Sequence, residues 1–291
     1  MKKLISLFLS VSVLLLAACS KQPDTASSEQ KNDAAGLQTV VIASTGSDAD
    51  IWRHIASLPE TKAAGIKLEV KNFTDYVAMN TAVANKEVDL NAFQSYAYLV
   101  AFNAANKDKI APVSTTYLEP MGIYSNKVKK VEEFAQGATI AIPNDGANES
   151  RALLLLQSAG LIKLKPDFDP VKGTPADIIE NSKKIVIKPI QMATAVRVKD
   201  EVDAILLGNT LAMEGGLNVL KDAIFYEPID QTTKLNVNVL ATAESRKDDA
   251  VLQKVGALYH TEAVKKYVQE HFAGTKVDVN KPTSYLTEAK S

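Results

Sequence analysis

One arginine follows a loop at the predicted start of a helix. Arg151 comes after Asn148-Glu149-Ser150, in the expected first turn of the helix that contains Leu153–Leu156. The positive end of a helix dipole disfavours a cation at this place. Arg151 therefore either bears a small penalty in solvent or shares an anionic ligand with the helix amides. A guanidinium can bind a carboxylate through two parallel hydrogen bonds.

Aromatic rings and side-chain amides near the ends of predicted strands are further candidates for ligand binding. Aromatic residues at such positions either face a cleft or cap the core. Asn209 follows the strand that ends at Leu207, and Asn238 lies within an apolar strand late in the chain. A buried amide needs hydrogen-bond partners, so Asn238 is more informative than a surface asparagine. The aromatic residues in question are Tyr76, Phe93, Tyr96 and Tyr98.

The sequence contains none of the common motifs of catalysis or metal binding. It has no HExxH motif, P-loop, G-x-S-x-G elbow or G-x-G-x-x-G loop, and no two of its 3 histidines share a helix turn. Its single cysteine, Cys19, excludes an intrachain disulfide and a cysteine-based zinc cluster. The sequence therefore favours a binding protein over an enzyme and predicts neither a cofactor nor a metal. A hydrolase is a less favoured alternative.

The composition is that of an ordinary globular protein. The chain has 291 residues, of which 46% are hydrophobic and 23% charged. Lys and Arg number 33 and Asp and Glu 34, so the formal net charge is -1 and the basic excess of a nucleic-acid-binding protein is missing. At roughly 150 residues per domain, the length suggests about two domains.

The N-terminal segment has the features of an export signal. Two lysines precede an apolar run that ends directly before Cys19. A membrane-spanning helix needs about 20 apolar residues, so residues 1–18 are predicted to be a signal peptide. The small residues before the lone cysteine resemble a bacterial lipoprotein box, which predicts lipidation of Cys19; a plain export signal with an incidental cysteine is the alternative. The polar composition of residues 19–36 predicts a flexible tether.

Strand and helix signals alternate through the rest of the chain, which predicts parallel strands joined by helical crossovers. We expect the first helix to be capped by Ser47 or Asp48, the next to open at Thr74-Asp75, and a later one to begin at Pro189. The remaining helices are expected up to Gly160 and near 246–258 and 261–272. The expected strands are 40–43, 66–70, 88–93, 139–142, 185–187, 202–207 and 237–241.

Two such units, with a strand and helices left over, predict an α/β protein of two lobes. The first lobe would comprise residues 37–118 and 240–291, and the second residues 119–239. The chain would cross between the lobes at Tyr117–Tyr124 and Leu235–Leu240, as in a two-crossing hinge. A ligand site is then expected in the cleft, at the carboxyl ends of the strands.

Four stretches carry a family resemblance that extends from about Thr39 to the C-terminal region. They run from Asp89 to Leu99, from Asn144 to Leu164, over Asp75-Tyr76 with Asn80, and over Asp203-Ala204 before Asn209. The first of them is similar to the pattern D-x-N-x-F-Q-H-x-P-Y-L. Together they resemble the NlpA-type methionine-binding lipoprotein family, the solute receptors of methionine ABC importers.

The resemblance implies a two-lobed periplasmic-binding-protein fold, with mixed sheets flanked by helices, that closes on its ligand. It implies that Arg151 holds the ligand carboxylate, that Asn209 and Asn238 bind the amino-acid head group, and that aromatic rings line the side-chain pocket. A thioether gains about 0.3–1.5 kcal/mol from each contact with such a ring. The predicted ligand-binding residues are Tyr76, Phe93, Ser95, Tyr98, Asn148, Arg151, Asn209 and Asn238.

Three positions depart from the family pattern. Ser95 stands where the family usually has histidine, Ala97 where it has proline, and Met79 where proline is common. The shorter Ser95 side chain leaves room for a larger ligand, such as a methionine-containing dipeptide, or for a water molecule. The ligand expected from the sequence is therefore methionine, in either the L or the D form, or a related small amino acid.

The expected protein is a monomeric, lipid-anchored solute receptor of the cell envelope. Its partners would be the amino-acid ligand, an ABC permease with its ATPase, and a membrane that holds the lipid anchor, whether inner or outer; nucleic acid is not expected. The alternative from another functional class is a surface lipoprotein with an adhesive or antigenic role.

Overall fold

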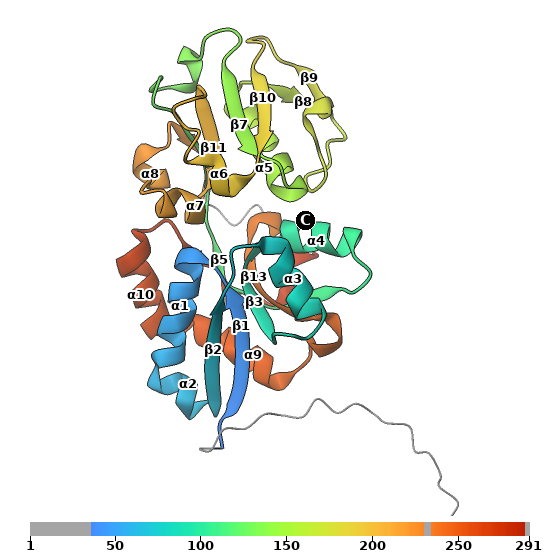
Figure 1. Cartoon of the computed structure of the whole chain (residues 1–291), viewed down its shortest axis with the longest axis vertical. Coiled ribbons are helices and arrows are strands. Elements are labelled where there is room, and N and C mark those ends of the chain that lie inside the picture. Colours follow the sequence, from blue (N-terminus) through green and yellow to red (C-terminus); the bar gives the residue numbers. More distant parts are fainter. Residues whose placement is uncertain (1–35, 230–233, 289–291) are drawn as a thin grey trace, which may run out of the picture. The chain divides into compact units, whose positions relative to one another are not determined.

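The computed structural model describes residues 36–229 and 234–288 of the chain (Figure 1). Cys19 and the predicted signal peptide lie outside these ranges. A five-stranded sheet, here called the first sheet, has the order β2-β1-β3-β13-β4. Its strands are β1 (Gln38–Ser44), β2 (Ile66–Asn72), β3 (Leu90–Ser95), β4 (Ile110–Thr115) and β13 (Asn238–Ala243).

Parallel pairing in the first sheet follows from its helical crossovers. β1 pairs parallel with both β2 and β3, because helices return the chain to the same edge before each new strand. The late strand β13 enters between β3 and β4 and is antiparallel to both. The helices of this part are α1 (Gly46–Ser57), α2 (Pro59–Ala63), α3 (Tyr76–Ala84), α4 (Tyr96–Ala105), α9 (Ala250–Tyr259) and α10 (Glu262–Phe272).

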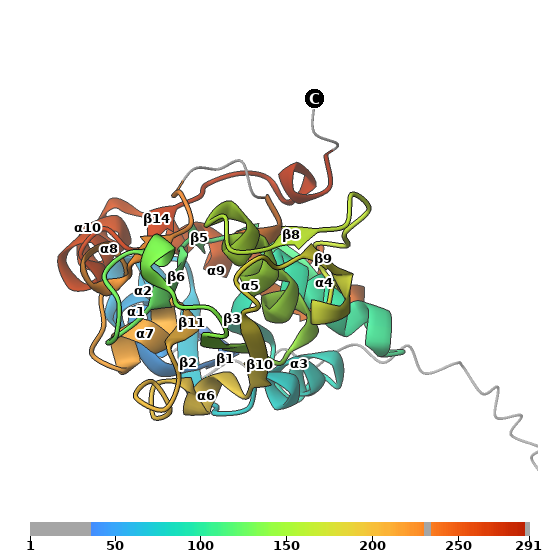
Figure 2. The same ribbon diagram turned by 90° about the horizontal axis from the view of Figure 1, so that it is seen from above.

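Helices cover both faces of the first sheet. Val40 and Ile42 of β1 pack with residues of α1, α9 and α10, whereas Ala43 packs with residues of α3 and α4. Successive side chains of a strand point to opposite faces, so the alternation along β1 assigns each group of helices to its own face. Figures 1 and 2 both show α1 and α10 on one side of this sheet and α3 and α4 on the other.

A second five-stranded sheet has the order β10-β7-β11-β6-β12. Its strands are β6 (Met121–Tyr124), β7 (Thr139–Pro143), β10 (Val186–Ile190), β11 (Ala204–Gly208) and β12 (Phe225–Tyr226). β7 is parallel to β10 and β11, while β6 is antiparallel to β11 and β12. The helices of this part are α5 (Gly146–Ser158), α6 (Met192–Ala195), α7 (Asn209–Glu214) and α8 (Val219–Asp222).

Shorter elements complete the fold. Two small antiparallel sheets join β5 (Tyr117–Leu118) to β14 (Val277–Asp278) and β8 (Lys163–Leu164) to β9 (Ile178–Glu180). Short 3-10 helices occupy Val131–Glu133, Pro175–Asp177, Lys234–Asn236, Glu244–Arg246 and Thr283–Leu286. None of the helices within the described ranges combines the length and the apolar run that crossing a membrane requires.

The predicted fold class is confirmed. Two mixed sheets are flanked by helices, and the chain passes from the first sheet to the second after β4 and returns after β12. The exact lobe boundaries, at residues 118/119 and 239/240, stay a prediction.

Two local expectations were wrong. Pro189 lies inside β10 and not at a helix start. β10 is an edge strand of the second sheet, the kind of strand that tolerates a residue without an N–H group. The first helix begins at Gly46 with Thr45 as its N-cap, so Asp48 falls in the first turn and is not a cap.

Candidate functional site

A cavity lies at the carboxyl ends of strands from both sheets. Thr45, Ser95 and Gly208, at the ends of β1, β3 and β11, all line it. The cavity lining includes every predicted ligand-binding residue except Asn209: Tyr76, Phe93, Ser95, Tyr98, Asn148, Arg151 and Asn238.

Three aromatic rings form one wall of the cavity. The ring centroids of Tyr76 and Phe93 lie 5.1 Å apart, and Tyr98 meets them edge-on at 6.3 and 5.7 Å. These separations are those of favourable aromatic pairs. Burial raises the pKa of both Tyr76 and Tyr98, so their hydroxyls remain neutral donors. The wall suits an apolar, polarisable side chain such as a thioether.

A buried amide cluster holds this wall in place from behind. Asn80 of α3 donates to Oε1 of Gln94 at 2.9 Å and accepts from Asn91 at 2.8 Å. Gln94 also donates to Oδ1 of Asn80 and of Asn91. Because buried amides are stable only when paired, the cluster fixes α3 against β3, and with them the positions of Tyr76 and Phe93.

Ser95 and Asn238 are neighbours on adjacent strands. They are paired in the register of β3 and β13. Ser95 is also the N-cap of α4, where its hydroxyl accepts a hydrogen bond from the backbone N–H of Tyr98 at 3.3 Å. Ser95 therefore has a structural contact of its own beside the cavity.

Arg151 is buried in the second turn of α5, because this helix begins at Gly146, earlier than expected. Its Nε and Nη2 donate to the Glu227 carboxylate, with Nη2–Oε2 at 2.6 Å, and Nη2 also donates to the backbone carbonyl of Glu119 at 2.8 Å. Burial opposes the charge of Arg151, but Glu227 keeps its pKa above the ordinary value. Within the described ranges Nη1 has no acceptor. That nitrogen is the part of the guanidinium left for a ligand.

The N-terminus of α5 is fixed by its own side chains. Asp145 is the N-cap and accepts hydrogen bonds from both the backbone and the side-chain amide of Asn148, at 3.1 and 2.9 Å. Burial raises the pKa of Asp145. The amide of Asn148 is thus held at the cavity edge by a local contact.

Asn209 contacts Glu119, a residue of the cavity lining. It is fully buried at the start of α7 but does not line the cavity. Its side-chain amide donates to Glu119 at 3.1 Å and to Thr275 at 3.0 Å. Within the described ranges its Oδ1 is buried without a hydrogen-bond partner, and its predicted role in binding the amino-acid head group stays a prediction.

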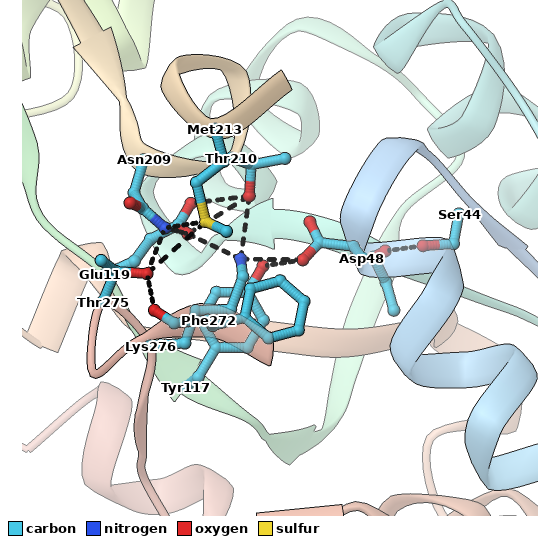
Figure 3. A network of polar contacts seen from close by, with 11 residues as sticks. Ser44, Asp48, Tyr117, Glu119, Asn209, Thr210, Met213, Phe272, Thr275 and Lys276 are labelled. Carbon is cyan, nitrogen blue, oxygen red and sulfur yellow. Dashed lines mark hydrogen bonds and ion pairs between the residues drawn. The ribbon is translucent and has the colours of Figure 1, made fainter. Parts of the chain in front are cut away.

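Sequence reasoning missed a charged network at the back of the cavity (Figure 3). Lys276, whose side chain is 0% exposed, donates to Asp48 at 2.9 Å, to Glu119 at 2.6 Å and to Thr210 at 2.8 Å. Its ammonium also lies 4.0 Å from the ring centroid of Tyr117. Of these residues, Asp48, Glu119 and Thr210 line the cavity.

The pKa values in this network reflect burial and mutual charge. Burial alone would lower the pKa of Lys276, but Asp48 and Glu119 raise it, so Lys276 is protonated. Burial opposes the charge of Glu119, yet Lys276 and its hydrogen bonds bring the pKa of Glu119 below its ordinary value. For Asp48, burial and the nearby Glu119 outweigh Lys276 and raise the pKa.

Among the described residues, no group of His, Cys, Asp and Glu could hold a metal ion.

The chain matches a known protein family over most of its length. The model of the family described as NlpA lipoprotein matches residues 40–280. The chain belongs to the NlpA lipoprotein family. This confirms the resemblance inferred from the sequence motifs.

Individual relatives of this NlpA lipoprotein agree with that assignment. A protein of Pasteurella multocida named probable D-methionine-binding lipoprotein MetQ is 35% identical over 272 residues, covering 94% of this chain and 96% of its own. Outer membrane lipoprotein 1 of Mannheimia haemolytica is 36% identical, covering 93% of this chain and 96% of its own.

A solved structure also resembles this NlpA lipoprotein. A nutrient binding protein from Burkholderia cenocepacia, bound to methionine, superposes with a TM-score of 0.76 at 34% identity. The match covers 82% of this chain and 99% of the other.

Proposed function

We propose that this NlpA lipoprotein is the solute-binding component of an ABC importer and that it captures methionine, or a related small amino acid, in the cavity described above. The proposal rests on the fact that the aromatic wall and Arg151 line the same cavity. Rings suit the methionine thioether, and Nη1 of Arg151 suits a carboxylate. The Burkholderia cenocepacia structure bound to methionine supports the same ligand.

The proposed mechanism is capture by lobe closure. Residues 37–118 and 240–291 would form one lobe and residues 119–239 the other, with the ligand held between them. Closure of this kind is a hinge motion, and the ligand stabilises the closed form only to the extent that it binds that form better. The closed receptor, anchored through lipidated Cys19, would then dock on a permease coupled to an ATPase. On this account the protein binds its ligand and delivers it to the permease without changing it chemically.

Calorimetric titration with L- and D-methionine tests the proposal. We expect heat of binding from at least one enantiomer. At a hundredfold excess over Kd, the ligand should raise the free energy of unfolding by about 2.7 kcal/mol, since it binds only the folded state. Absence of both heat and stabilisation with either enantiomer would contradict the methionine assignment. It would favour the alternative, an adhesive or antigenic surface lipoprotein.

A methionine-containing dipeptide is the second candidate ligand, because Ser95 presents a short side chain to the cavity. Competition between methionine and the dipeptides Gly–Met and Met–Gly distinguishes the two ligands. Displacement of methionine by a dipeptide at equal concentration would assign the space beside Ser95 to a second residue of the ligand.

A further inference from the structure

A small apolar cluster joins the two parts of the fold outside the cavity. Ala97 of α4, Ala147 of α5 and Val171, in the loop between β8 and β9, are its buried members. In the part of the chain that the structure describes, Tyr98 is the one member that also lines the cavity. We call the cluster the α4–α5 seam; its partly buried members are Tyr98, Val100, Ala101 and Leu235.

The seam occupies a face of α4 that is separate from the face buried in its own core. Ala97, Val100 and Ala101 are spaced by three and four residues, so their side chains share one side of the helix. Leu99 and Phe102, also three apart, pack in a core with residues of the first sheet. Figures 1 and 2 both show α4 beside α5. α4 therefore has a second apolar face, and the partner of that face is α5.

The buried side chains of the seam are small. Alanine methyl groups bury little apolar surface, and the stabilisation from burial is proportional to that surface. By contrast, the core that α5 shares with the second sheet contains Leu153, Leu155 and Leu156. The seam is therefore much weaker than the cores on either side of it, so it can open while both parts of the fold stay folded.

The seam lies directly beside the cavity. Ala97 and Ala147 are each the second residue of their helix. The residues that follow them, Tyr98 and Asn148, both line the cavity. The packing of Ala97 with Ala147 therefore fixes how far apart Tyr98 and Asn148 lie. Contact at the seam is in this way coupled to the assembly of the cavity, although the alanines themselves are not part of its lining.

We propose that the α4–α5 seam is a closing contact that holds a share of the ligand-free molecules in the closed arrangement, the one in which the seam is formed. The inference rests on the proposed function, because it assigns part of lobe closure to residues that do not touch the ligand. The apparent affinity of a receptor is proportional to the share of molecules already competent to bind. The seam therefore changes the affinity for every ligand by the same factor.

The ligand-free protein tests the seam directly. Ala101→Asp adds a charge that is solvated when the seam is open and must lose water when the seam forms. Ala104→Asp is the matched control, because it adds the same charge at an exposed position of the same helix. In solution scattering without ligand, we expect the radius of gyration of Ala101→Asp to exceed that of Ala104→Asp. Equal radii would overturn the proposal.

Calorimetry measures the consequence for affinity. The ligands are methionine and norleucine, in which a methylene group replaces the sulfur. Relative to Ala104→Asp, we expect Ala101→Asp to weaken the binding of both by the same factor, about tenfold or more, since it lowers only the share of molecules that can bind. A change in the ratio of the two affinities would show that the substitution acts on the cavity through Tyr98, and would contradict the proposal.

A second variant separates the result from a folding defect. If Ala101→Asp does not fold, as judged by its melting transition, Val171→Ala replaces it in both measurements. Loss of two methyl groups from the seam should weaken both ligands by about threefold to tenfold. A wild-type protein that binds neither ligand contradicts the proposed function, and the scattering comparison then still decides on the seam. Binding by the wild type together with equal radii contradicts the seam alone.

Discussion

The Arg151 guanidinium serves two partners at once. Its Nε and Nη2 are held by Glu227 and by the Glu119 carbonyl, which fixes the orientation of Nη1. The contact of Arg151 with a ligand carboxylate stays a prediction, in which Nη1 is the nitrogen without an acceptor among residues 36–229 and 234–288. Rigid placement reduces the entropy lost when the ligand binds.

Arg151→Ala should abolish most of the affinity for methionine. The substitution removes the donor and leaves Glu227 without its cation, and breaking such a charged contact reduces affinity by about 30-fold or more. Calorimetry checks the affinity, and urea unfolding checks stability separately. Glu227→Ala is the matched comparison, because it keeps the Arg151 guanidinium but removes the carboxylate that fixes its orientation. Unchanged methionine affinity in Arg151→Ala would remove this residue from the site.

Ser95→Ala isolates the capping role of the serine. Loss of the contact to the Tyr98 N–H should lower the free energy of unfolding by about 1 kcal/mol, as measured by urea denaturation. Ser95→Thr retains a hydroxyl and should lose less. A Ser95→Ala protein as stable as the wild type would show that the cap contributes nothing to α4.

The residues of the cavity lining that carry local signals could be predicted from the sequence, and those without such signals could not. Aromatic residues at strand ends and an arginine in a helix could be recognised from their neighbours in the chain. The ion pair of Lys276 with Asp48 joins residues 228 positions apart, and a single lysine before Val277 has no periodicity or motif. Only the fold brings these charges together.

At the scale of elements, the strands with strong hydrophobic patterns were predicted well. β1, β2 and β7 lie where their apolar runs indicated, because a buried parallel strand has a continuous or alternating apolar sequence. β4 and β6 were not predicted. Pro112 lies inside β4, and Gly122 lies inside β6; proline and glycine normally indicate a break in a strand, and tertiary pairing overrides that local preference here.

Asp203 links two strands of the second sheet in a pH-dependent way. Its carboxylate accepts from the backbone N–H of Thr139 at 2.7 Å and from Lys127 at 3.0 Å, and these contacts hold its pKa below the ordinary value. A carboxylate with a lowered folded-state pKa adds stability that is complete above the unfolded-state pKa and is lost as the pH falls through the folded-state pKa. We therefore expect stability to decline below about pH 4.

Asp203→Asn should reduce the decline of the free energy of unfolding below about pH 4. Urea unfolding at a series of pH values between about 6 and 3 measures the effect. Asp108→Asn, at an exposed position, is the matched control and should leave the slope unchanged. An Asp203→Asn profile parallel to that of the wild type would show that other carboxylates account for the acid sensitivity.

At the scale of the whole molecule, the two sheets are connected by more than their two chain crossings. The Lys276 network bonds α1 of the first sheet to α7 of the second through Asp48 and Thr210. A ligand that binds beside this network contacts groups from both parts of the fold. Its binding energy is then available to favour one arrangement of the two lobes over others.

Solution scattering can measure this arrangement. We expect the radius of gyration to fall when methionine is added in excess, because hinge closure brings the lobes together. Arg151→Ala at the same methionine concentration should not respond. A wild-type radius that stays constant on saturation, with binding confirmed by calorimetry, would show that capture occurs without closure.

The position of β13 also has a consequence for how the protein is made. This strand separates β3 from β4 in the first sheet, yet it begins at Asn238 of 291 residues. A nascent chain emerges from its N-terminus onward, so the edges of β3 and β4 have no partner until most of the polypeptide has left the ribosome. Unpaired edges invite association with other strands, and chaperones that hold the growing chain would find their binding sites there.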